Sequence, residues 1–407
     1  MSNTLPKFIP ITINMPTNIK SVFDINNDIY FNTNIDYPKC SFGFNHYIHS
    51  IRNKDGEVLK QFENKKKIYN VNCPFELKID NYNNSIYDEF KKFFKLKDTD
   101  IITTQTTILW EILFMFDLIN IDSNTIISSH NNSGMGQAYL LFRDTYSKTN
   151  LADKDIIIMP TNNIFSIYKN DSRINNTKSN KSNKFDLITI TTNQDDIILD
   201  KTMQEQEYFI ELLNNICNSI LNQKTGGCFI IKIYETFTNV SSKILALLIN
   251  LYEKVFIVKP YTSKPYLTEK FIVCINYNNK YTKNIQTLLD ELNKKRNNNL
   301  NIVDLITGYK LSNDLLFKII MMNKICIEQQ YKSLGSIISY VNSQNYYGEI
   351  YQQKRNEQIE AATFWTDLFL PTKDKFKDNK KIINNISFMT NKINVDRTID
   401  ISHKLIL

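Results

Sequence analysis

The feature that most constrains the fold is an alternation of short apolar segments with helical segments through the middle of the chain. Residues 125–130, 185–191 and 226–235 are apolar runs bounded by polar or glycine-containing turns, which is typical of buried strands. The segment 203–223, which follows the second of them, has apolar residues at three- and four-residue spacing, as an amphipathic helix requires. This alternation predicts an α/β domain with a mainly parallel sheet and helices on both faces.

Two further strands are expected at one edge of this sheet. Residues 255–259 (VFIVK) and 270–277 (KFIVCINY) are both apolar and are joined by the ten residues PYTSKPYLTE. Ten residues leave no room for a crossover helix, so the two strands should pair antiparallel.

Pattern and composition divide the chain into four parts. Residues 1–97 form an N-terminal extension with few clear periods, much of it expected to be loop. Residues 98–283 form the α/β core, in which the polar stretch 170–184 is expected to be an exposed loop. Residues 284–371 form a helical region with helical patterns at 284–295, 314–343 and 348–370, and residues 372–407 are a tail rich in Lys and Asn.

Composition limits the partners and the compartment. The 407 residues are 42% hydrophobic, enough for a sizeable core, and the net charge of +7 permits a polyanionic partner. No apolar run opens the chain, and the longest one, residues 108–121, is too short for a membrane span and carries Glu111 and Asp117. Six cysteines without CxxC spacing, and the isolated pair His46 and His49, predict no disulfide framework and no metal site. These features favour a protein of the cytoplasm that binds no membrane.

One charged residue, Lys232, stands among the apolar residues of the segment 226–235. A buried unpaired ammonium is costly, so such a lysine is normally paired, deprotonated or functional. Glu269 immediately precedes the last expected strand, and both residues can converge on one pocket. Two interpretations remain open: a structural salt bridge, or a lysine that assists deprotonation of a ribose hydroxyl.

The turn after the first expected strand reads SHNNSGMGQ. A strand, a glycine-containing turn and a helix are a common way to hold a nucleotide-like ligand, and Gly134 and Gly136 would let the backbone approach it closely. The alternative is a tight strand-to-helix turn with Ser133 as the N-cap.

Basic and aromatic residues also gather near the edge strands. Lysines with tyrosines suit phosphate contact and base stacking, although a solvated hairpin would look the same. RNA contact is predicted for Lys259, Tyr261, Ser263 and Lys264, with Tyr266 and Lys270 beside them.

A second aromatic stretch, NYYGEIYQQKRNEQIEAATFW (residues 345–365), includes Lys354 and Arg355. A stripe of this kind is more typical of a core or an inter-helix seam than of a ligand site.

Residues 226–277, GGCFIIKIYETFTNVSSKILALLINLYEKVFIVKPYTSKPYLTEKFIVCINY, resemble the signature of the FtsJ-like RNA ribose 2'-O-methyltransferases, especially the mRNA cap branch. That signature has a GG-strand-Lys block, a leucine-rich helix, and then K-P-x-T-S-R-P before an acidic residue and a strand. Weaker similarity extends back to about Thr104, so the resemblance covers roughly half the chain. It implies a Rossmann-like sheet with one antiparallel strand, S-adenosylmethionine as the methyl donor, and RNA, including capped mRNA, as the partner.

The family works through a lysine–aspartate–lysine–glutamate tetrad. By the resemblance, Lys232 is the second lysine and Glu269 is the glutamate. Thr191 stands where the family has its aspartate, and Asp195 and Asp196 follow too far along the chain to substitute without a local rearrangement.

Two other family features are altered. The first lysine should lie in the helix before the first strand, but the expected helix TTILWEILFMFDL contains no lysine. The methionine-binding turn lacks the acid and the proline of the family pattern. Within that turn, cofactor contact is expected for Asn131, Ser133, Gly134 and Gly136.

Loss of two tetrad members should lower the rate by several orders of magnitude, since such residues act as a unit. The sequence therefore favours a catalytically degenerate relative that binds RNA or supports a partner in a capping or transcription assembly. The alternative is an active S-adenosylmethionine-dependent cap ribose 2'-O-methyltransferase. The richness in Asn, Lys and Ile indicates AT-rich coding, and with the cap-like signature it favours a large DNA virus that replicates in the host cytoplasm.

Overall fold

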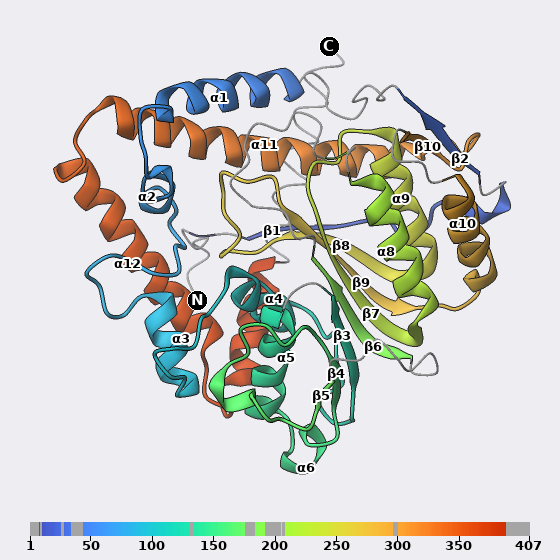
Figure 1. Cartoon of the computed structure of the whole chain (residues 1–407), viewed down its shortest axis with the longest axis horizontal. Helices are drawn as coiled ribbons and strands as arrows, with labels where there is room; N and C mark the ends of the chain where they lie inside the picture. Colours follow the sequence, from blue (N-terminus) through green and yellow to red (C-terminus); the bar gives the residue numbers. More distant parts are fainter. Residues whose placement is uncertain are drawn as a thin grey trace.

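A computed structural model gives the arrangement of most of the chain. It describes residues 10–25, 28–33, 44–130, 133–175, 184–191, 208–295 and 300–387, together with Phe8 and Glu205. Within these residues, an eight-stranded sheet lies between two layers of helices (Figure 1).

The strand order in this sheet is β1-β8-β9-β7-β6-β3-β4-β5. The strands are β1 (Ile11–Asn14), β3 (Ile126–His130), β4 (Ile156–Ile158), β5 (Ile174–Asn175), β6 (Phe185–Ile190), β7 (Gln223–Ile233), β8 (Tyr252–Lys259) and β9 (Lys270–Tyr277). Strands β3 to β7 run parallel, whereas β9 pairs antiparallel with both β7 and β8. The predicted mixed α/β sheet is thus confirmed. The predicted antiparallel pair is also present, but β9 is inserted inside the sheet and β1, from the N-terminal extension, forms the edge beyond β8.

Strand β7 shows why these apolar runs form buried strands. Successive side chains alternate between the two faces of a sheet. Phe229 and Ile231 pack in the cluster that contains α8 (Phe209–Leu221), α9 (Asn239–Leu251) and α10 (Thr282–Lys295). Cys228 and Ile230 pack in the opposite cluster, with α4 (Thr104–Met115) and α5 (Ser133–Tyr146). A strand covered on both faces needs an unbroken apolar run, which this part of the sequence has.

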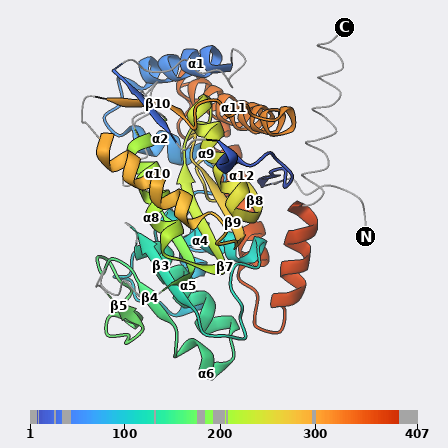
Figure 2. The ribbon, with the colours of Figure 1, turned by 90° about the vertical axis from the view of Figure 1, so that its right-hand side faces the viewer.

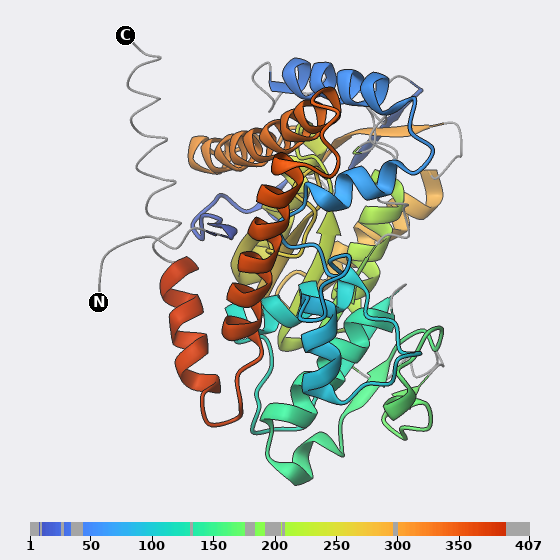
Figure 3. The same ribbon diagram turned by 90° about the vertical axis from the view of Figure 1, so that its left-hand side faces the viewer.

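The terminal additions, which are the parts of the chain before residue 98 and after residue 283, wrap around the carboxyl end of the central strands. Helices α1 (Phe44–Leu59) and α11 (Asn313–Asn342) lie side by side across that end (Figures 1 and 2). Helix α12 (Glu349–Phe369) then runs along the flank of the core, next to α2 (Lys65–Val71) and α3 (Ile86–Phe94) (Figure 3). The smaller elements are η1 (Val22–Asp24), α6 (Thr149–Ala152) and η2 (Ser166–Tyr168).

The predicted C-terminal helical region is confirmed by α10, α11 and α12, and two other expectations of secondary structure were wrong. Between α10 and α11, β10 (Asn301–Leu305) pairs antiparallel with β2 (Ile29–Asn32) in a separate two-stranded sheet. Part of the expected N-terminal loop is helix α1, whose apolar residues are buried against α11. In the polar stretch 170–184, β5 adds a two-residue strand to β4, and residues 176–183 lie outside the described part.

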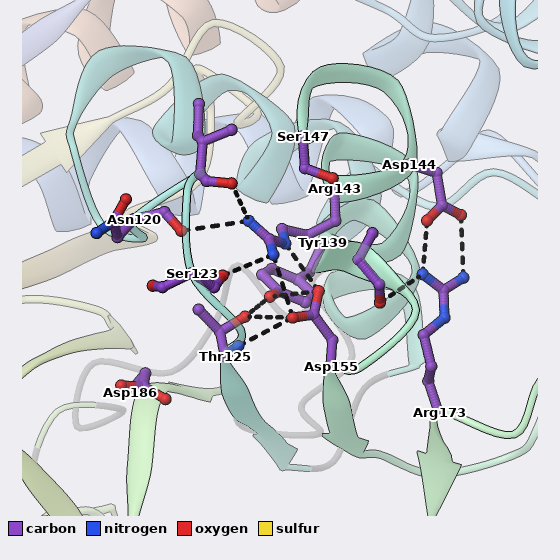
Figure 4. Close-up of polar contacts among 12 residues, drawn as sticks. Asn120, Ser123, Thr125, Tyr139, Arg143, Asp144, Ser147, Asp155, Arg173 and Asp186 are labelled. Carbon is purple, nitrogen blue, oxygen red and sulfur yellow. Dashed lines mark hydrogen bonds and ion pairs between the residues drawn. The ribbon is translucent and has the colours of Figure 1, made fainter. Parts of the chain in front are cut away.

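A buried charged network anchors the opposite, amino-terminal end of the central strands (Figure 4). Arg143 of α5 is fully buried, and its Nε donates to Asp155 at 2.7 Å. The same guanidinium donates to the backbone carbonyls of Asn120, Ile121 and Ser123, just before β3. Because these bonds reach both Asp155 and the loop before β3, the network fixes α5, the residue before β4 and the entry to β3 together.

None of the described helices combines the length and the hydropathy that a membrane span needs. The described residues also contain no group of three or more His, Cys, Asp and Glu side chains placed to hold a metal ion.

Candidate functional site

Lys232 and Glu269 meet at the carboxyl end of β7. The Lys232 Nζ lies 3.0 Å from the Glu269 Oε2, and each side chain is only 2% exposed. The antiparallel pairing of Lys232 with Phe271 and of Ile233 with Lys270 brings Glu269, one residue before β9, to the end of β7. The predicted convergence of these two residues is therefore present in the structure.

Glu269 is held by a second set of contacts from the loop before it. Ser263 Oγ donates to Glu269 Oε1 at 3.0 Å. Burial alone would raise the pKa of Glu269, but the charges of Lys232 and Lys259 outweigh it and hold the pKa below its ordinary value. Glu269 is therefore an anion, and it supplies the negative charge that Lys232 needs.

Lys259, at the end of β8, belongs to the same buried cluster. Its Nζ donates to the backbone carbonyls of Leu267 and Glu269, both at 2.8 Å, and to Ser263 Oγ at 3.3 Å. Burial lowers the pKa of Lys259 to about 8, with the charge of Glu269 opposing the shift. The lysine thus ties together the two ends of the loop 260–269.

This loop is fastened to the core by a residue that the sequence did not single out as functional. Glu111 of α4 accepts from the backbone N–H groups of Tyr261 at 2.6 Å and Thr262 at 3.0 Å. It also accepts from Thr262 Oγ1 at 2.6 Å and from Trp365 Nε1 of α12 at 3.0 Å. Burial raises the pKa of Glu111 to about 7 against these hydrogen bonds. In the sequence, the one sign of this role was that Glu111 is a charged residue within an otherwise apolar helix.

Thr191 directly follows β6, the strand that pairs with β7. The last pair in the parallel β6–β7 register is Ile190 with Ile231, and one more residue sets Thr191 level with Lys232. Thr191 is buried and carries no charge. Asp195 and Asp196 lie outside the described residues.

The glycine turn after β3 is partly described. Helix α5 begins at Ser133, Gly134 lies in its first turn, and Asn131 lies outside the described residues. A side chain at Gly136 would place a Cβ 2.3 Å from the Sδ atom of Met159, the residue after β4. A Cβ at Gly136 would therefore force the Met159 side chain to move, and because α5 begins at Ser133 the N-cap position lies outside the described residues. The described residues here do not show a cradle for a methyl donor.

The predicted RNA-contact residues lie in the loop 260–269 or at its start. Lys259, Tyr261 and Ser263 are buried, and their polar groups bond within the protein. Lys264 forms a short ion pair with Glu76, with 14% of its side chain exposed. RNA contact by these four residues stays a prediction, and Lys264 is the one of them nearest to the surface.

Two buried carboxylates next to Lys232 were also missed by the sequence. Glu235 accepts from Arg52 of α1 at 2.7 Å, and although burial opposes it, the Arg52 charge keeps the Glu235 pKa below its ordinary value. Glu205 accepts from the backbone N–H groups of Phe237 and Thr238, both at 3.0 Å, where α9 begins. Glu205, Lys232 and Glu235 share the lining of a cavity of about 30 Å³, room for about one water molecule.

The comparison with known families decides the identity of this region. A family model of the FtsJ-like methyltransferases matches residues 127–277, from β3 to the end of β9. The chain carries an FtsJ-like methyltransferase domain. The FtsJ-like domain therefore includes the Lys232–Glu269 pair, the glycine turn and the loop between β8 and β9.

Relatives of the FtsJ-like domain include cap methyltransferases. Over 116 residues, the chain is 33% identical to cap-specific mRNA (nucleoside-2'-O-)-methyltransferase 1 of Dictyostelium discoideum, a match that covers 28% of this chain and 15% of the relative. It is 25% identical over 176 residues to the inactive cap-specific mRNA (nucleoside-2'-O-)-methyltransferase 1B of Caenorhabditis briggsae, covering 41% of this chain and 20% of the relative. The chain thus spans a fifth or less of these proteins.

A viral protein matches over a longer stretch. The chain is 25% identical over 270 residues to an uncharacterized protein of Acanthamoeba polyphaga mimivirus, and the match covers 66% of each chain. Because 270 residues is more than the family model covers, this similarity extends beyond residues 127–277.

Proposed function

We propose that this protein acts on RNA as a catalytically degenerate FtsJ-like methyltransferase, serving as an RNA-binding or scaffold subunit of a capping or transcription assembly. The observation that carries the proposal is Thr191, a buried neutral residue that directly follows β6, whose last pair with β7 is Ile190 with Ile231, the residue before Lys232. In the family pattern that place belongs to an aspartate. A neutral threonine cannot help to organise the charges of the site or of a methyl donor.

Two further observations support loss of activity. Helix α4 contains no lysine, and its buried carboxylate, Glu111, is engaged in holding the loop before β9. Met159 packs against Gly136 in the turn where the family binds S-adenosylmethionine. When bound, that cofactor supplies a methyl group carried by a positively charged sulfur. The turn lacks the acid and the proline of the family pattern, so we expect weak binding or none.

The scaffold role rests on the way the additions enclose the site. Arg52 of α1 pairs with Glu235, and Gln330 of α11 donates to the carbonyl oxygen of Tyr266 at 2.8 Å. Trp365 of α12 donates to Glu111. Such contacts hold the carboxyl end of the sheet rigid. They suit a surface that binds a partner better than a site that opens for turnover.

One observation favours the alternative, an active S-adenosylmethionine-dependent cap ribose 2'-O-methyltransferase. The Lys232–Glu269 pair is intact, and a charged lysine could stabilise the developing negative charge on a ribose 2'-oxygen as its proton leaves. Glu269 would then position Lys232.

Calorimetric titration with S-adenosylmethionine and S-adenosylhomocysteine, beside anisotropy with labelled capped RNA, separates the two functions. The degenerate function predicts RNA binding with no cofactor binding up to millimolar ligand. Micromolar cofactor binding, lost in a Gly134→Trp variant that still folds, would favour the active enzyme. Absence of RNA binding would overturn both.

A further inference from the structure

A pocket outside the FtsJ-like domain has the character of a nucleic-acid site. It has a volume of about 210 Å³ and lies between α2, α12 and the segment around residues 76–80. Figure 3 shows α12 passing beside α2 on this flank. Gln358 of α12 also lines the pocket. Its Nε2 donates to the carbonyl oxygens of Asn70 at 2.8 Å and Cys73 at 3.1 Å, which joins α12 to the end of α2.

Positive charge dominates this pocket. Lys66, Lys67, Lys78 and Arg355 line it, and the structure gives none of them an ion pair with a described residue. The lining has two carboxylates, Glu76 and Asp80, and Glu76 is already neutralised by Lys264. The excess of cations therefore favours an anionic ligand with several charges.

Aromatic side chains stand next to these cations. Tyr351 lines the pocket, and its hydroxyl accepts from Arg355 Nη1 at 3.5 Å. The ring of Tyr347 lies 6.2 Å from that of Tyr351 and is 89% exposed. The sequence favoured a buried seam for this stretch, and Trp365 does fulfil that role, but Tyr347 does not. An exposed aromatic ring beside cations is suited to stacking against an unpaired base whose phosphates contact those cations.

The pocket is connected to the candidate site through two contacts. Glu76 in its wall binds Lys264, and Ser263, the preceding residue, donates to Glu269. The loop 260–269 is therefore part of both the wall of the pocket and the candidate site.

We propose that the pocket between α2 and α12 binds single-stranded RNA, with the lysines on its phosphates and Tyr347 and Tyr351 against a base. The inference rests on the proposed function, which makes RNA the ligand, and it adds the place where RNA is held. The exposed tyrosine favours RNA over an acidic protein segment, which would use the lysines alone.

The test is fluorescence anisotropy of the full chain with a short labelled uncapped RNA across a salt series. A variant with Lys66→Gln, Lys67→Gln and Lys78→Gln should bind about tenfold more weakly or worse. Its slope of log affinity against log salt should fall by about 2, since each lost phosphate contact on a single strand contributes about 0.7. All three lysines are exposed, so folding should be unaffected.

The matched control is Lys283→Gln, Lys294→Gln and Lys310→Gln. These lysines are also exposed, and they lie on and near α10, on the opposite side of the molecule from α12 (Figure 1). This control should bind RNA as the unaltered protein does.

Stacking is tested separately from charge. Tyr347→Ala should weaken binding about tenfold without changing the salt slope. Its control is Tyr331→Ala, at a half-exposed tyrosine of α11. Equal loss in the two tyrosine variants would overturn the stacking assignment.

The outcomes separate this inference from the proposed function. If the unaltered protein binds RNA and the three-lysine variant binds equally well, the inference is wrong and the proposed function stands. If the unaltered protein binds no RNA, the proposed function fails as well. If polyglutamate displaces the RNA as well as unlabelled RNA does, the pocket is a site for an acidic protein and the inference is overturned.

Discussion

The Lys232 Nζ lies 3.0 Å from the Glu269 Oε2, in a place where each side chain is 2% exposed. Burial makes an unpaired charge costly at this position, so the loss of either partner should destabilise the fold. The ion pair is therefore expected to be needed for the stability of the fold, whether or not the protein transfers methyl groups.

Removing one member of this pair should be strongly destabilising. Lys232→Met removes the ion-pair partner of Glu269 and leaves Lys259 to offset its buried charge. We expect a loss of about 3–5 kcal/mol in the free energy of unfolding. The double variant Lys232→Met with Glu269→Gln should be less destabilised than the sum of the single variants. Denaturant unfolding measures all three. A control is Lys224→Met at the surface pair with Asp186, which should cost about 1 kcal/mol or less.

The Arg143–Asp155 network should be a second point of sensitivity. Arg143→Met removes the guanidinium from Asp155 and from three carbonyl groups, so we expect a loss of about 3–5 kcal/mol, measured by denaturant unfolding. The matched control is Lys148→Ala, whose ion pair with Asp122 is 3.0 Å long but exposed, and which should cost about 1 kcal/mol or less. Similar losses in both variants would contradict the structural role given to Arg143.

Asp55 of α1 should make the stability depend on pH. Burial raises the pKa of Asp55 to about 6, against a hydrogen bond from Tyr69, and its Oδ1 has no hydrogen-bond partner in the described part of the chain. The folded state therefore binds the proton more tightly than the unfolded state does. The contribution of protonated Asp55 to the free energy of unfolding is complete below about pH 4 and is lost as the pH rises through about 6.

The measurement for Asp55 is the thermal midpoint between pH 4 and pH 7, compared with that of Asp55→Asn. Asn keeps an acceptor for the Tyr69 hydroxyl but does not titrate, so the variant should lose part of the decline with rising pH. An unchanged pH profile would show that the Asp55 pKa is not raised.

A substitution at Gly136 tests whether this glycine serves packing or ligand binding. Gly136→Ala forces the Cβ against Met159, and we expect a loss of about 1–3 kcal/mol, measured by thermal or denaturant unfolding. In a Met159→Ala background, Gly136→Ala should cost less than it does in the unaltered protein, because the opposing sulfur is absent. If Gly136→Ala leaves stability unchanged, packing does not explain this glycine, and a ligand would be the better explanation.

The sequence predicted the sheet because its signals are local. Apolar runs such as that of β7 show a strand buried on both faces, and the short link between β8 and β9 permits only antiparallel pairing. The convergence of Lys232 and Glu269 followed from the same reasoning, aided by a family pattern of specific spacing.

The sequence could not predict what depends on distant contacts. Helix α1 is stabilised by burial against α11, and β10 by pairing with β2, so neither is evident from its own residues. The same holds for Glu111, which looks like an isolated charge in an apolar helix until Tyr261 and Thr262 are placed beside it. The burial of Lys259 and Ser263 likewise depends on how their loop folds back on Glu269.

The most direct test of the central claim is methyl transfer to capped RNA from radiolabelled S-adenosylmethionine. The unaltered protein, Lys232→Met and Thr191→Asp should all show no transfer above background, because restoring one carboxylate leaves α4 without its lysine. Anisotropy in the same samples should still show RNA binding. Transfer above background by the unaltered protein would contradict the account and establish an active ribose methyltransferase.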